Sequence, residues 1–147
     1  LPQAAGAARH HVPGPVQSQL PGPRRPARSV HQHGRLWQRA ADAAVEADAS
    51  FEHAAALRLR GRFFTRAPSP FGDLARARTD LERACAAAPI PLNLLYLGDA
   101  LFELELVEEA RGAWLRAVEA EGAGFPATTG VHRELARRRL SLVATSP

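Results

Sequence analysis

The 147-residue sequence has no methionine and only one cysteine, Cys85. A single cysteine excludes an internal disulfide framework and leaves the redox compartment undecided. Because no initiator methionine is present, we expect a fragment or a processed form, in which an upstream signal peptide or lipid-anchor cysteine would not be visible. No apolar run approaches the roughly 20 residues that cross a bilayer, so no membrane span is expected.

Valine and isoleucine are also sparse, although hydrophobic residues make up 46% of the chain and alanine dominates them. β-Branched residues favour strands, whereas alanine is the strongest helix former. The composition therefore predicts an all-α protein. A helical body of about 100–110 residues is large enough to bury a core of its own.

Acidic residues are absent from the first 35 positions, which carry five arginines. The net charge of the whole chain is +4, so the remainder of the chain has a net charge of −1. The basic character belongs to the N-terminal segment, and the helical body is close to neutral. This distribution argues against a phosphate-binding surface on the body, and we expect no nucleic-acid partner.

The segment 1–33 holds six of the twelve prolines, three glycines and four histidines, but no aromatic residue. Such a segment buries too little apolar surface to offset the entropy of ordering it. Two interpretations stay open, a disordered Pro/Arg/His-rich tail or a segment that is not native coding sequence.

After this segment, helix formers alternate with breakers, and the pattern predicts antiparallel helices joined by short loops. The helices are expected at residues 36–47, 51–66, 73–88, 92–104, 107–121 and 128–142. Asp73 is a candidate N-cap. Pro68 and Pro70 end the second helix, Pro89 and Pro91 end the third, and Gly122 closes the fifth.

Two of these helices fit one repeat motif. The tetratricopeptide pattern places a Leu-Gly pair on a first helix and two alanines flanking a bulky residue on a second. All seven expected positions are filled, by Leu94, Leu97, Gly98, Leu101, Ala110, Trp114 and Ala117. Small residues allow the two helices to approach closely, while Leu101 and Trp114 fill the space beside them.

The preceding segment repeats the pattern at a constant shift of 33 residues. Ala77, Leu81 and Ala84 correspond to Ala110, Trp114 and Ala117. The matching glycine, Gly61, comes four residues early, which indicates an insertion of four residues in the Pro-rich loop at 66–71. A generic helical bundle is the alternative, but it does not explain the constant shift.

The sequence resembles one bacterial group of tetratricopeptide proteins, those similar to the T component associated with TRAP transporters. The resemblance covers about residues 34–140. It depends on Gly61-Arg62-Phe63-Phe64, Ala67-Pro68, Gly72-Asp73, Leu81-Glu82-Arg83-Ala84, Asn93 and Glu108-Glu109-Ala110-Arg111. It implies a periplasmic, often lipid-anchored scaffold beside a substrate-binding protein. The sequence departs from this group because it shows no lipobox and has fewer repeats.

The change in composition and the repeat pattern divide the chain into five parts. They are the tail at 1–33, a partial repeat helix at 34–50, a repeat with a loop insertion at 51–90, a second repeat at 91–124, and a capping helix with its tail at 125–147. The expected architecture is antiparallel helix pairs stacked as a short right-handed solenoid.

Repeat stacks present the inner face of each first helix to partners. In the first repeat this face is expected to carry Arg58, Arg62 and Arg66, and in the second Leu95, Asp99, Phe102 and Glu103. The functional interpretation is a groove that grips a carboxylate or an acidic peptide through arginine. The structural alternative, more common on such surfaces, is that the two arginines at 62 and 66 pair with the acids at 99 and 103.

No catalytic residue, metal site or cofactor is predicted. The histidine pairs at 10–11 and 31–33 lie in the tail, without the converging geometry that a metal needs. Cys85 lies in an alanine-rich helix with no histidine nearby, the setting of an inert buried thiol. Trp114 is expected in the core, and Trp37 to pack over the truncated end or form part of an exposed patch that favours association.

The function most favoured is therefore a non-catalytic scaffold that binds a protein or peptide in its groove. Two alternatives stay open: a periplasmic accessory of a TRAP-type solute transporter, and a structural repeat segment of a longer chain. A homo-oligomer is a further expectation. The location is periplasmic if the resemblance holds and cytoplasmic otherwise.

Overall fold

The computed structural model describes residues 27–121 and 125–144, with side-chain surroundings from residue 31 onward. These residues form six helices and no strand, which confirms the all-α prediction. The helices are α1 (Ala27–Ala47), α2 (Phe51–Arg66), α3 (Leu74–Ala87), α4 (Pro91–Glu103), α5 (Val107–Glu119) and α6 (Pro126–Ala144).

Helix α2 has the predicted bounds, and Asp73 caps α3 as expected by accepting a hydrogen bond from the backbone of Arg76. The predicted start of α1 is wrong, because the helix begins at Ala27, nine residues before position 36. Its first seven residues fall in the segment predicted to be disordered. Pro26 is the last proline of that segment, so no breaker follows it. The rest of the predicted tail, residues 1–26, lies outside the described residues.

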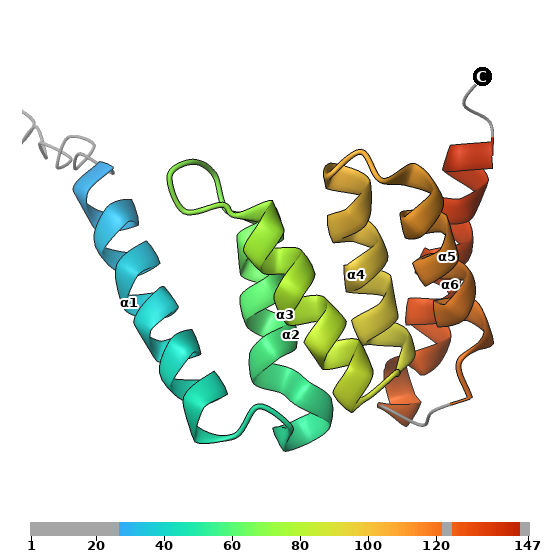
Figure 1. Cartoon of the computed structure of the whole chain (residues 1–147), viewed down its shortest axis with the longest axis horizontal. Coiled ribbons are helices and arrows are strands. Elements are labelled where there is room, and N and C mark those ends of the chain that lie inside the picture. The colour runs from blue at the N-terminus through green and yellow to red at the C-terminus, as the bar shows by residue number, and fades with distance from the viewer. Residues whose placement is uncertain (1–26, 122–124, 145–147) are drawn as a thin grey trace, which may run out of the picture.

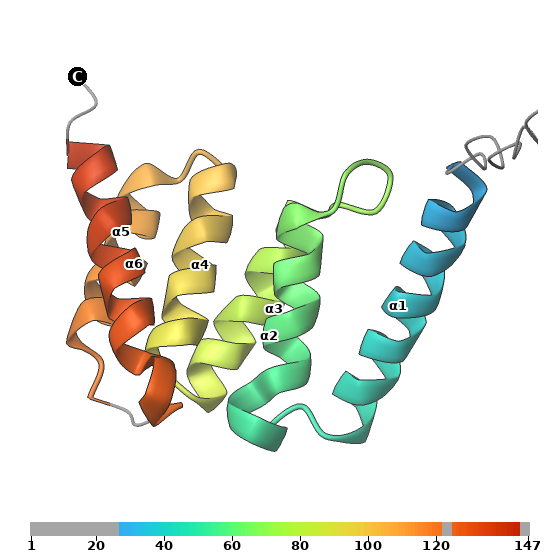
Figure 2. The same cartoon turned by 180° about the vertical axis from the view of Figure 1, so that it is seen from behind.

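The helices stand side by side in a row and alternate in direction (Figure 1). Helices α3 and α5 lie on one face of the row and α2, α4 and α6 on the other, as the reverse view also shows (Figure 2). Helix α4 packs along both α2 and α6, whereas the backbones of α3 and α5 do not approach each other in the described chain and the exposed ion pair of Arg78 with Glu109 links these two helices. The second face is therefore the more closely packed one. We call the surface of α2, α4 and α6 the inner face.

The pairs α2/α3 and α4/α5 are built alike, each around one glycine. A Cβ added to Gly61 would lie 2.6 Å from Leu81, and one added to Gly98 would lie 2.4 Å from Trp114. The sequence pattern predicts both close approaches. Seven residues connect α2 to α3 and three connect α4 to α5, which accounts for the four-residue displacement of Gly61.

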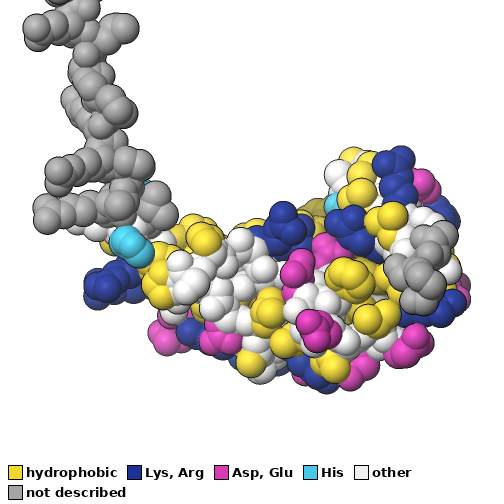
Figure 3. Space-filling view, turned by 90° about the horizontal axis from the view of Figure 1, so that it is seen from above, with side chains coloured by type: hydrophobic (Ala, Val, Ile, Leu, Met, Phe, Trp, Pro, Cys, Tyr) yellow, Lys and Arg dark blue, Asp and Glu magenta, His cyan; other side chains and the backbone are white. Residues whose placement is uncertain are grey.

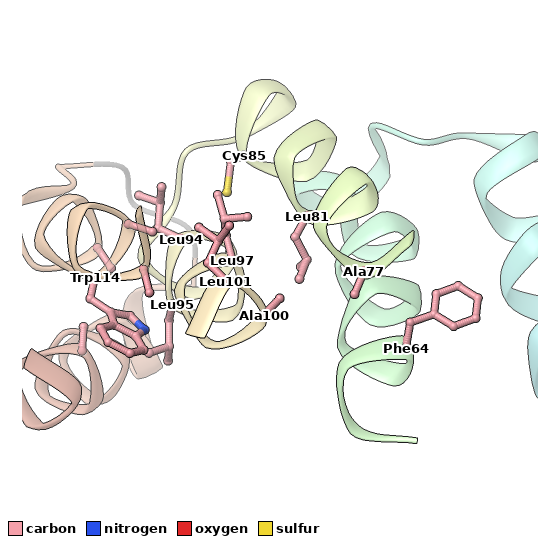
Figure 4. Packing of buried hydrophobic residues seen from close by; sticks show 14 residues of the cluster. Phe64, Ala77, Leu81, Cys85, Leu94, Leu95, Leu97, Ala100, Leu101 and Trp114 are labelled. Atoms are coloured by element: carbon pink, nitrogen blue, oxygen red, sulfur yellow. The ribbon is translucent and has the colours of Figure 1, made fainter. Parts of the chain in front are cut away.

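The core runs continuously from Phe64 and Leu81 to Leu101 and Trp114 (Figure 4). The alanines on the second helix of each pair, Ala77, Ala84, Ala110 and Ala117, are fully buried. Trp114 is 1% exposed, which confirms its predicted place in the core. A second, smaller cluster, formed by Ala54, Leu57 and Ala84, packs against Val45 of α1 and against Ala49, which follows that helix.

A buried ion pair holds the first three helices together. The Arg60 guanidinium donates from Nε and Nη2 to the two carboxylate oxygens of Asp80, each at 2.7 Å, and from Nη1 to Asp42 of α1 at 2.8 Å. Such bidentate geometry is the strongest form of this contact. Trp37 adds an aromatic stack on Phe63, with ring centroids 4.1 Å apart.

The first turn of α2 is wound the opposite way to the rest. Glu52, His53 and Ala54 have φ values of 51°, 59° and 62°. A left-handed conformation costs about 1–2 kcal/mol for each such residue. The turn is held by its tertiary contacts, because the His53 carbonyl accepts hydrogen bonds from Arg58 Nη1 at 3.1 Å and Asn93 Nδ2 at 3.0 Å.

Candidate binding groove on the inner face

A cavity of about 180 Å³ lies on the inner face, where α2, α4 and α6 end. Its lining combines charged and apolar side chains, namely Arg62, Thr65, Arg66, Asp99, Phe102, Glu103, Trp114, Arg139, Leu142 and Val143. The three helices run in the same direction (Figure 1). Seen from above, arginine and acidic side chains lie next to one another at this end of the molecule (Figure 3).

Asp99 is the centre of the charged part. Its Oδ2 accepts from Arg62 Nη1 at 2.9 Å, and its Oδ1 accepts from Arg139 Nε at 3.2 Å. The Arg62 guanidinium also lies over the Tyr96 ring, 4.5 Å from its centroid. These contacts confirm one half of the structural alternative, the pairing of Arg62 with Asp99.

The other half of that alternative, an ion pair between Arg66 and Glu103, is not formed. Both side chains are exposed and line the cavity, and neither has an ion-pair partner within the part of the chain that the structure describes. Arg66 occupies the last turn of α2. Helix C-termini carry negative partial charge, so a cation is favoured there. Three guanidinium groups therefore face two carboxylates in this cavity, which leaves one positive charge in excess.

The apolar part of the cavity contains large side chains that remain in contact with solvent. Phe102 is 47% exposed and Leu142 is 62% exposed. Phe102 packs on Trp114, with ring centroids 5.7 Å apart. The buried Trp114 Nε1 has no hydrogen-bond acceptor among the described residues. A ligand here would find apolar surface next to guanidinium donors.

Five of the seven predicted site residues line this cavity: Arg62, Arg66, Asp99, Phe102 and Glu103. The predicted placement of the other two is wrong, because Arg58 is 6% exposed and Leu95 is 3% exposed. Each precedes the crossing glycine of its helix by three residues. These two equivalent positions of α2 and α4 are thus both buried, whereas the predicted residues further along each helix line the cavity.

Arg58 instead forms part of a buried polar network. Its Nη1 donates to Asn93 Oδ1 at 3.2 Å and to the His53 carbonyl, and its guanidinium lies over the Phe125 ring. Burial lowers the pKa of Arg58, and burial together with this guanidinium lowers the pKa of His132. Arg58 therefore has a structural role.

The contribution of α6 is missing from the sequence-based prediction. Arg139, Leu142 and Val143 belong to a helix predicted only as a cap, and Trp114 is predicted only as core. If the helix at the C-terminal end had been treated as the first helix of a third pair, its inner face would have included Arg139. The signal is weak because α6 does not repeat the Leu-Gly motif.

No constellation in the described residues suggests covalent chemistry. Cys85 is buried, and burial raises its pKa to about 12, so the thiolate is scarce at neutral pH. Groups of three or more metal-ligating side chains do not come together in the described parts of the chain. The histidines at positions 10 and 11 lie outside those parts.

Comparison with known proteins gives no identification: no protein-family model, curated protein or solved structure matches the chain. Within residues 27–121 and 125–144, no helix has both the length and the apolarity that crossing a membrane requires.

Proposed function

We propose that this chain is a tetratricopeptide-type helical-repeat protein that binds an acidic segment of a protein partner on its inner face. The proposal has two parts, the repeat class and the ligand. Each part is supported by a separate set of contacts.

The repeat class is supported by the equivalence of the two helix pairs. Gly61 meets Leu81 in the first pair and Gly98 meets Trp114 in the second, and Leu81 and Trp114 stand 33 residues apart. Two pairs built on one plan and stacked in a row form a short solenoid. Helices α1 and α6 then flank the two repeats as a partial unit and a cap.

The ligand is inferred from the cavity at the ends of α2, α4 and α6, which carries the proposal. Arg66 is an exposed guanidinium without an ion-pair partner among the described residues, beside the Arg62–Asp99–Arg139 cluster. An arginine fork recognises a carboxylate by paired hydrogen bonds. Phe102 and Leu142 offer apolar contact at the same place. The expected ligand is therefore a peptide segment with an acidic residue next to an aliphatic one.

Selection from short randomised peptides displayed on phage, against the full chain, tests this assignment. We expect the selected sequences to be enriched in Asp or Glu beside Leu or Ile. Binding of the best synthetic peptide is then measured by fluorescence anisotropy for the wild type and for Arg66→Glu. The reversal of charge should weaken binding at least about tenfold, since one charge-assisted contact contributes on the order of 1.4 kcal/mol or more.

Arg111→Glu is the matched control, because Arg111 is exposed on α5, away from the cavity. This variant should bind the peptide like the wild type. Circular dichroism must show that both variants are as helical as the parent. Selection of peptides without acidic residues, or equal loss in both variants, would refute the cavity as the binding site.

The narrower functions predicted from the sequence, an accessory of a TRAP-type transporter and a repeat segment of a longer chain, stay predictions. Neither is favoured by a particular contact in the described residues.

A further inference from the structure

Helix α1 has an apolar face that no other helix covers along the described chain. Among the helices, α1 packs along α2, and its Asp42 also reaches Arg76 of α3. It lies at one end of the row, with its outer side open (Figure 1). Spacings of three and four residues place four exposed residues on that side, Leu36, Ala40, Ala43 and Ala47. Leu36 is 63% exposed.

The charges beside this face are divided between its two ends. Arg35 and Arg39 lie toward the start of the helix and Glu46 toward its end, all exposed. They lie on one side of α1, because Arg35, Arg39 and Glu46 follow each other at spacings of four and seven. None of the three forms an ion pair with another described residue. By contrast, Asp42 of the same helix is paired with both Arg60 and Arg76.

We infer that a second copy of this chain covers the face, by antiparallel pairing of α1 with α1 about a two-fold axis. The axis passes between Ala41 and Asp42. In this register Leu36 lies over Ala47 of the second copy, and Ala40 lies over Ala43. Because this two-fold axis is perpendicular to both helices, the charged sides of the two α1 helices lie on the same side of the dimer. Glu46 of one copy therefore lies between Arg35 and Arg39 of the other, and each ion pair is formed twice.

The occupant is a copy of the same chain because the face is complementary to itself. Alanines allow close helix approach along the centre, the single large aliphatic residue meets an alanine, and opposite charges meet only when the helices are antiparallel. In a parallel two-fold pairing the charged sides of the two helices would lie on opposite sides of the dimer, so neither arginine would meet Glu46 of the other copy. The contact involves one helix from each chain, so the dimer is expected to be weak, with a Kd on the order of 10 µM.

Sedimentation velocity of the full chain across about 2 to 200 µM, a range that spans this Kd, measures the association. The wild type should pass from monomer to dimer. Glu46→Arg places like charges together, as does Arg35→Glu/Arg39→Glu, and each variant alone should dimerise at least about tenfold more weakly. An equimolar mixture of the two variants restores every opposite-charge contact, and should form a heterodimer as readily as the wild type.

Ala43→Glu, at the centre of the face, should be monomeric even in mixtures, whereas Arg111→Glu, on the exposed side of α5, should dimerise normally. Circular dichroism confirms that each variant is folded. A wild type that stays monomeric throughout the range overturns the inference. The same result is expected if another segment, and not a second copy, occupies the face. A dimer that responds to Ala43→Glu, but is not restored on mixing, overturns the antiparallel register.

Discussion

The indole of Trp114 lies so close to Gly98 that a Cβ on the glycine would come within 2.4 Å of the ring atoms Cδ1 and Nε1. Trp114 is fully enclosed by the core, so the ring has little room to move away. The same relationship joins Gly61 and Leu81 in the preceding helix pair, at 2.6 Å. Both contacts set how closely the paired helices approach.

Gly98→Ala should therefore destabilise the protein by about 2–4 kcal/mol, since overpacking forces a shift of backbone or ring. Gly112→Ala is the matched control, because a Cβ at Gly112 of α5 meets nothing within 4 Å. That change should stabilise the protein by about 0.5–1 kcal/mol through helix propensity. Urea unfolding followed by circular dichroism measures the unfolding free energy of both variants. Equal effects of the two changes would show that the contact with Trp114 does not limit the size of residue 98.

Asn93 is predicted to be a critical polar residue of the core. Its buried Nδ2 donates to the carbonyls of His53, Ala84 and Ala88, the last at 2.8 Å. Asn93→Leu should cost about 3 kcal/mol, because it leaves buried acceptors and the Arg58 guanidinium without their partner. The control is Thr79→Ala, which removes an exposed hydrogen bond and should change the unfolding free energy by less than about 0.5 kcal/mol.

The Cys85 thiol should make the stability depend on alkaline pH. Burial raises its folded-state pKa from 9.0 to about 12, so above pH 9 the unfolded chain loses this proton while the folded chain keeps it. The unfolding free energy should then fall by about 1.4 kcal/mol more for the wild type than for Cys85→Ala between pH 8 and pH 10. Below pH 8 the two should respond to pH alike. Parallel curves throughout the alkaline range would contradict the assignment.

Asp99→Asn separates binding from structure in the cavity. Removing this carboxylate leaves Arg62 and Arg139 without their shared anion. If the cavity binds acidic peptides, affinity should rise several-fold and depend more steeply on salt, because the excess positive charge grows from one to two. Anisotropy titrations at low and high salt check this, and thermal unfolding should report a loss of about 1–2 kcal/mol. Unchanged affinity would mean that the cluster is only structural.

Much of the fold is predictable because its signals are local. Prolines and Asp73 mark where helices end and begin, and the constant spacing of small and bulky residues identifies both crossing glycines. The start of α1 is less predictable. Its first turns come directly after a proline-rich segment, and composition averaged over that segment hides the change.

The groove is only partly predictable for a different reason. Helical periodicity places Arg58 and Arg62 on the same face of their helix, but it does not say which of them other helices will cover. The structure buries Arg58 with Asn93 and leaves Arg62 at the cavity. The approach of Arg139 to Asp99 spans 40 residues and has no counterpart in the repeat motif.

The sequence by itself determined the helical class, the positions of the helix breaks and the glycines that allow the helices to cross, since each depends on near neighbours or on a fixed period. Only the tertiary structure decided which charges are paired, which are buried and which stay available. Those outcomes depend on the distances between helices and on how much water they exclude. The exposed guanidinium of Arg66 and the uncovered face of α1 are both results of that packing.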